Sequence, residues 1–119
     1  MSGLLRAFLV VFLVVLTVYT LIVVAEYGPN LFPVYFGDMA DLNWRGQFNL
    51  DFMGFLILSL LWVTWRHHFS PLGLVLGFFA GIGGMVFLCI YLLVIGAQAK
   101  GDMQEVFLGK QRASALPKS

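Results

Sequence analysis

The sequence predicts an all-α membrane protein with three transmembrane helices, of which the second and third form an antiparallel hairpin. Of its 119 residues, 61% are hydrophobic and only 11% are charged, whereas about 25% are charged in an ordinary soluble domain. Three apolar stretches also lack any Asp, Glu, Lys or Arg, at residues 7–25, 52–65 and 69–99. A helix needs about 20 apolar residues to cross a bilayer. We therefore assign residues 1–99 to one three-helix transmembrane domain.

The first helix is expected at residues 4–25. It is apolar on every side, and a backbone in lipid has few ways other than a helix to satisfy its hydrogen bonds. Glu26 closes this helix, and a Gly-Pro pair shortly after it is a helix-stop signal. The loop at 27–45 is rich in aromatic residues, so we expect it in the membrane interface, with room for a short helix starting near Asp38.

The second helix is expected at residues 46–65. Its charge-free part has 14 residues and would measure only about 21 Å. An extension back to Gly46 gives a length that can cross the membrane and places Asp51 inside the helix.

The third helix is expected at residues 71–97, directly after a Ser70-Pro71 pair that is typical of a helix N-cap and first residue. Such a short connection makes the second and third helices antiparallel neighbours. The third helix is longer than a bilayer requires, so it must tilt, bend or protrude. The adjacent glycines Gly83 and Gly84 are the expected position of a bend.

Residues 100–119 form a polar C-terminal tail. Within it, 106–108 are apolar and could dock on the bilayer or on a partner, whereas 113–119 are expected to be unstructured in the isolated chain. Three crossings would put the N-terminus and the 66–70 connection on one side of the membrane. The loop at 27–45 and the tail would lie on the other side.

Two carboxylates are candidate functional groups. Glu26 ends the first helix at the membrane level where the second helix begins, close to Asp51. A pair of acids on one face would have its pKa values forced apart, as a proton-handling site requires. The alternative is that both acids are solvated residues of the interface.

Four glycines are candidate helix-packing residues. Gly73, Gly77 and Gly81 recur at a spacing of four, with Gly84 nearby, so the first three share one helix face and allow a close approach. The surface that approaches could be another helix of this chain, a second copy, another subunit, or a flat lipid or pigment.

His67 and His68 follow Arg66 and are weak candidates for a haem, pigment or metal ligand. A metal site needs three or four ligands, and the sequence holds no second His or Cys cluster. We therefore predict no metal and no cofactor, and leave contact with a lipid, quinone or pigment open. The scattered basic residues also argue against nucleic-acid binding.

Residues 43–46 (Asn-Trp-Arg-Gly), 49–52 (Asn-Leu-Asp-Phe) and 65–66 (Trp-Arg) carry a resemblance. In these stretches the chain resembles uncharacterised small bacterial three-helix membrane protein families. This resemblance implies the fold and a location in a membrane, and it implies no activity. We expect that membrane to be the bacterial inner membrane.

The leading hypothesis is a small accessory subunit of a larger bacterial membrane complex, such as a respiratory or photosynthetic one, that docks through its glycine face. Its partners would be the lipid bilayer and other membrane subunits or further copies of itself, and its N-terminus would be cytoplasmic. One alternative is a membrane enzyme or carrier for an apolar lipid, isoprenoid or quinone, with Glu26 and Asp51 as acid and base. Another is a small homo-oligomeric transporter. A non-catalytic role is favoured over an enzyme.

Overall fold

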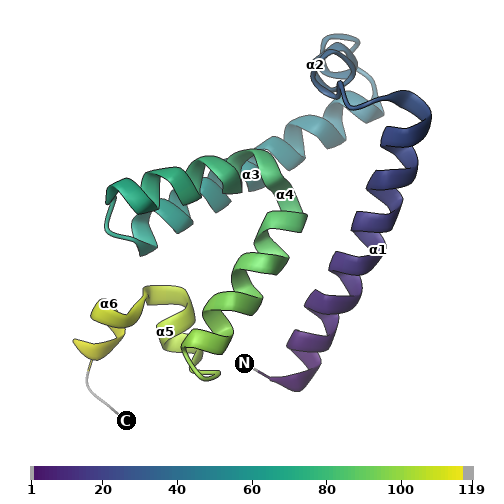
Figure 1. Ribbon diagram of the computed structural model, residues 1–119. Helices are drawn as coiled ribbons and strands as arrows, with labels where there is room; N and C mark the ends of the chain where they lie inside the picture. Colours follow the sequence, from purple (N-terminus) through teal and green to yellow (C-terminus); the bar gives the residue numbers. More distant parts are fainter. Residues whose placement is uncertain (1, 117–119) are drawn as a thin grey trace.

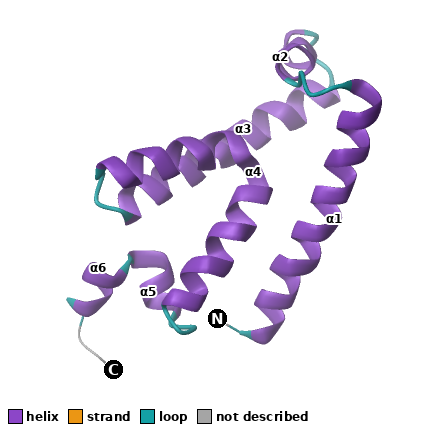
Figure 2. Cartoon of the chain, viewed as in Figure 1, coloured by secondary structure: helices purple, strands orange, loops and turns teal. Residues whose placement is uncertain are grey.

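The computed structural model describes residues 2–116, and its regular structure in that range is entirely helical (Figures 1 and 2). Three helices are long and apolar enough to cross a membrane: α1 (Gly3–Tyr27), α3 (Trp44–Arg66) and α4 (Pro71–Gln98). Three shorter helices complete the chain: α2 (Phe32–Ala40), α5 (Met103–Leu108) and α6 (Lys110–Ser114). The predicted fold class is therefore confirmed, including the antiparallel hairpin of α3 and α4.

Short polar residues cap the long helices. The Asn43 side chain accepts a hydrogen bond from the Gly46 N–H at 2.8 Å, and the Ser70 hydroxyl accepts one from the Gly73 N–H at 3.1 Å. These bonds satisfy amide groups that have no partner inside a helix. The α3 helix therefore begins two residues before the expected start at Gly46, and Asp51 lies inside it.

The loop after α1 is more ordered than the sequence suggested. Its helix α2 begins at Phe32, with Pro33 in the first turn, and Asp38 lies near its end instead of its start. The Tyr35 hydroxyl donates to the Asn49 carbonyl oxygen, and the Asn49 amide donates back to the Tyr35 carbonyl oxygen at 3.0 Å. These two reciprocal hydrogen bonds hold α2 against the first half of α3.

The glycine face of α4 packs on α3. A Cβ atom built on Gly77 would overlap the Thr64 hydroxyl oxygen, and one on Gly81 would lie 2.8 Å from a Leu60 methyl carbon. The third glycine of the face, Gly73, is buried against the same helix. The surface that approaches the glycine face is therefore a helix of the same chain, and this face is not open for another subunit.

The α4 helix turns back on itself at Gly84, which has φ 57° and ψ −141°. In a straight helix Tyr91 would lie about 30 Å from Pro71. Instead the Tyr91 hydroxyl is 2.7 Å from Nε2 of His67, in the connection that precedes α4. The second half of α4 therefore returns toward the end of α3 and runs beside α1 (Figure 1).

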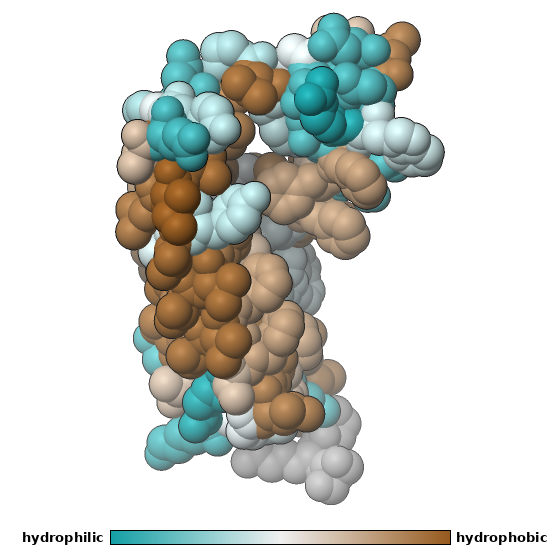
Figure 3. Space-filling model, turned by 90° about the vertical axis from the view of Figure 1, so that its right-hand side faces the viewer, coloured by the Kyte–Doolittle hydropathy of each residue, from teal (hydrophilic) through white to brown (hydrophobic). Residues whose placement is uncertain are grey.

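This reversal changes where the tail lies. The tail contacts the 66–70 connection, whereas three full crossings would have placed them on opposite sides of the membrane. Its residue Val106 is completely buried, and residues 113–114 are helical instead of unstructured; residues 117–119 lie outside the described range. The N-terminus lies at the same end of the molecule, and α2 lies at the other end (Figure 1). Between the polar ends is a broad apolar surface (Figure 3).

Candidate functional site

The best-defined polar structure joins the end of α3 to the tail. We call it the Arg66 junction; it consists of Trp62, Arg66, His67, Tyr91 and the α5–α6 segment. The Arg66 guanidinium donates from Nε to the Val106 carbonyl oxygen at 2.7 Å and from Nη2 to the Glu105 carbonyl oxygen at 3.2 Å. A third bond runs from Nη1 to the Tyr91 hydroxyl at 3.3 Å. One half-buried arginine thus connects α3, α4 and α5.

The remaining carbonyl groups at the end of α5 also receive side-chain donors. Trp62 Nε1 donates to the Phe107 carbonyl oxygen at 3.0 Å, and Arg112 approaches the Leu108 carbonyl oxygen at 3.5 Å. The last carbonyls of a helix have no partner inside it, so these donors stabilise a helix that is only six residues long.

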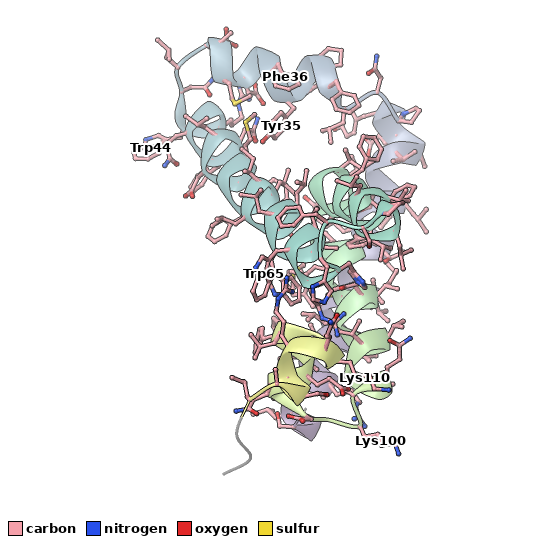
Figure 4. The ribbon with its side chains drawn as sticks, turned by 90° about the vertical axis from the view of Figure 1, so that its left-hand side faces the viewer. Tyr35, Phe36, Trp44, Trp65, Lys100 and Lys110 are labelled. Carbon is pink, nitrogen blue, oxygen red and sulfur yellow. The ribbon has the colours of Figure 1, made fainter. Side chains whose placement is uncertain are left out.

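Arg112 fastens α6 to α3. Its guanidinium donates to the Trp65 carbonyl oxygen at 2.6 Å and lies 3.9 Å above the centre of the Trp65 ring. Figure 4 shows Trp65 at this junction and Lys110 on the adjacent tail. A cation at this distance from an indole face is attracted by the ring quadrupole. The described part of the tail therefore packs against its own chain.

His67 acts as a hydrogen-bonding group in the junction. Burial lowers the pKa of its imidazole, and the adjacent Arg66 and His68 lower it further. The neutral ring can pair with the Tyr91 hydroxyl at 2.7 Å. Protonation would bring a second positive charge next to Arg66, so the neutral form belongs to the folded junction.

The two candidate carboxylates both lie on the surface of the chain. Glu26 and Asp51 are exposed, one at the end of α1 and the other inside α3. Arg45 pairs with Asp38 at 3.6 Å instead of reaching Asp51. An acid–base pair of Glu26 and Asp51 stays a prediction from the sequence.

The histidines do not form a metal site. Among the described residues no group of three His, Cys, Asp or Glu side chains could hold a metal ion. His67 is engaged with Tyr91, and His68 is exposed in the tight connection with a positive φ of 58°.

An apolar opening lies between α1 and α3, and we call it the α1–α3 cleft. It has a volume of ≈ 580 Å³, and its lining is almost entirely apolar. Phe12 lines it from α1, Phe55 and Ser59 line it from α3, and Met85 and Leu88 line it from the second half of α4. The Ser59 hydroxyl oxygen is buried there and has no hydrogen-bond partner among residues 2–116.

Sequence reasoning missed most of these residues. Trp62 and Arg66 had the usual character of a membrane-interface boundary, and nothing local in the sequence pairs them with Tyr91 or Arg112. The one available signal for these contacts was the presence of cations in the polar tail. Lys and Arg side chains commonly donate hydrogen bonds to the last carbonyl groups of a helix. Ser59 gave no signal, since a serine within an apolar helix usually bonds to its own backbone.

Comparisons with family models, with curated proteins and with solved structures found no match.

Proposed function

We propose that this chain is a small accessory subunit of a larger membrane protein complex and that it docks through the α1–α3 cleft. The observation that carries this proposal is the combination of an open apolar cleft with a buried, unpartnered Ser59 hydroxyl. The α1 helix packs against the second half of α4, and most of its remaining surface is exposed. Leu9 is its one buried residue. A helix from another subunit would complete the bundle by packing between α1 and α3.

The Ser59 hydroxyl favours a protein partner over lipid chains alone. A buried hydroxyl without a partner costs about 1–3 kcal/mol, and a hydrocarbon chain offers no acceptor. Helices in membranes commonly associate through small residues and interhelical hydrogen bonds. The Ser59 hydroxyl oxygen is closed off in the isolated chain, so its side chain would have to rotate toward the cleft, where a polar side chain or free carbonyl of a partner helix would supply the acceptor that this chain lacks.

This proposal differs from the sequence-based one in the docking surface. The glycine face is covered by α3, so the cleft takes its place. The enzyme or carrier hypothesis, with Glu26 and Asp51 as acid and base, likewise stays a prediction from the sequence. An energy-converting complex stays a prediction from the sequence.

The same proposal places the N-terminus and the tail in the cytoplasm of a bacterium. Lys and Arg residues gather on cytoplasmic segments. The end of the molecule that holds the N-terminus, the 66–70 connection and the tail carries five of the seven cations, whereas Arg45 lies at the α2 end and Lys118 lies outside the described residues. The five are Arg6, Arg66, Lys100, Lys110 and Arg112.

A site-specific photo-crosslinker tests the docking surface. Benzoylphenylalanine would replace Phe55, which lines the cleft, or Phe78, which is similarly exposed on α4 but outside it; their exposed fractions are 66% and 60%. After irradiation of native membranes, we expect Phe55→benzoylphenylalanine to crosslink to a different polypeptide and Phe78→benzoylphenylalanine to do so much less. Crosslinks to a second copy of the chain would indicate a homo-oligomer. Equal crosslinking at both positions, or none at either, would contradict docking in the cleft.

The Ser59→Ala variant gives a second readout. Removal of an unsatisfied hydroxyl should leave the isolated protein as stable as before, or more so, and should weaken its co-purification with the partner. Thr20→Ala is the control, because that hydroxyl is already bonded to the Leu16 carbonyl oxygen of its own helix at 2.7 Å. Unchanged co-purification of Ser59→Ala would show that the partner does not use this hydroxyl.

A further inference from the structure

A polar pocket lies on the side of the Arg66 junction that faces the 67–70 connection. Its volume is ≈ 490 Å³, within the range of about 300–1,000 Å³ typical of small-molecule sites. Four elements line it: the end of α3 with its connection, the last turn of α4, α5 and α6. We call it the junction pocket; it is separate from the α1–α3 cleft, with which it shares no lining residue.

The charges around the junction pocket are unbalanced. Arg66, His68 and Lys110 line it together with a single acid, Glu105. Glu105 forms no ion pair with any of them among the described residues. With Arg66 and Lys110 positive, Glu105 negative and the histidines neutral, the lining has a net formal charge of +1, so the pocket favours an anion.

Arg66 still has donors available for such an anion. A guanidinium carries five N–H groups, and those that the junction uses donate to two backbone carbonyl oxygens and one hydroxyl. None of these acceptors is charged, and half-buried cations are normally paired with an anion. Phosphate oxygens match this planar fork of donors particularly well.

The depth of the pocket in the membrane identifies the source of the phosphate. Trp65 lies immediately before Arg66 on α3 and Trp62 lies one helical turn earlier, and tryptophan is concentrated at the level of lipid headgroups. Basic pockets between helix ends at that level are suited to anionic headgroups. We propose that the junction pocket binds the phosphate group of an anionic phospholipid, held by Arg66, His68 and Lys110.

Two lysines of the tail provide a matched test. Lys110 lines the pocket at the start of α6, whereas Lys100 lies outside it (Figure 4). The purified, delipidated protein would be titrated with phosphatidylglycerol or with phosphatidylcholine, and native mass spectrometry would count the bound lipids. We expect phosphatidylglycerol to bind more tightly, Lys110→Gln to weaken it about fivefold, and Lys100→Gln to leave it unchanged.

Glu105→Gln should act in the opposite direction and strengthen binding of phosphatidylglycerol, because it removes the only negative charge lining the pocket. Equal effects of Lys110→Gln and Lys100→Gln would overturn the proposal, as would equal binding of the two lipids by the unmodified protein. Competition with inorganic phosphate is the remaining test. If millimolar phosphate alone displaces phosphatidylglycerol completely, the pocket is a free-phosphate site and the assignment to lipid fails.

Discussion

Substitution of Gly77 by alanine tests whether the α3–α4 contact depends on a glycine. An alanine Cβ would overlap the Thr64 hydroxyl oxygen and lie 3.2 Å from the Leu60 carbonyl oxygen. The carbonyl belongs to a helix backbone and cannot rotate away, so the two helices must separate. Overpacking of this kind costs about 1–3 kcal/mol. The opposing gain in helix propensity from glycine to alanine is at most about 1 kcal/mol.

Gly54→Ala is the matched control. Like Gly77 in α4, Gly54 lies in the interior of a long helix, α3, but a Cβ there would meet no atom within 4 Å. Unfolding would be followed by tryptophan fluorescence in dodecylmaltoside micelles as the fraction of sodium dodecyl sulfate increases. We expect Gly77→Ala to lower the free energy of unfolding by up to about 2 kcal/mol after the gain in propensity. Gly54→Ala should leave it unchanged or raise it.

A double variant distinguishes a steric overlap with Thr64 from a loss of stability that has another cause. Thr64→Ala removes the atom that the new methyl group would overlap, although it also removes the hydrogen bond from Thr64 to the Leu60 carbonyl oxygen. The double variant Gly77→Ala/Thr64→Ala should therefore be more stable than the sum of the single effects predicts. Additive effects, or a Gly77→Ala variant as stable as Gly54→Ala, would refute the reasoning.

Three further predictions follow from the reversal of α4 and from the junction. Gly84→Ala should lower the free energy of unfolding by about 1–3 kcal/mol in the same titration, because Gly84 has a backbone conformation that side chains rarely adopt. The pKa of His67 is lowered by burial and by its two cationic neighbours, so the unfolded chain binds its proton more readily; stability should be full above pH ~6.5 and fall as the pH drops below that value. His67→Gln should remove this dependence, and an unchanged slope between pH 7.5 and 5.5 (roughly the window given by the usual histidine pKa) would contradict it. In a variant without the native cysteine, Ser70→Cys and Lys100→Cys should react with an impermeant maleimide from the same side of the membrane, and labelling from opposite sides would show that α4 crosses fully.

Several features were predictable because their causes are local in the sequence. Charge-free stretches long enough for a bilayer mark the long helices, and an acid such as Asp51 can be placed inside α3 by counting the residues that a membrane requires. Ser70 and Pro71 identify the start of α4, because capping depends on atoms a few residues apart. The spacing of the glycines in α4 likewise predicted a close helix contact.

Which segments pack against one another could be learned only from the tertiary structure. A glycine pair indicates that a helix can bend, but the direction depends on the one backbone conformation that Gly84 adopts, and that direction returns Tyr91 to His67. The position of the tail follows from this reversal of α4, because Arg66 can reach the carbonyl groups of α5 only when α4 turns back. The sequence by itself thus determined which segments are helical and apolar, since hydrophobicity and capping act over a few residues. Only the tertiary structure decided which end of the molecule holds the tail and which surfaces stay open, since those depend on contacts between residues tens of positions apart.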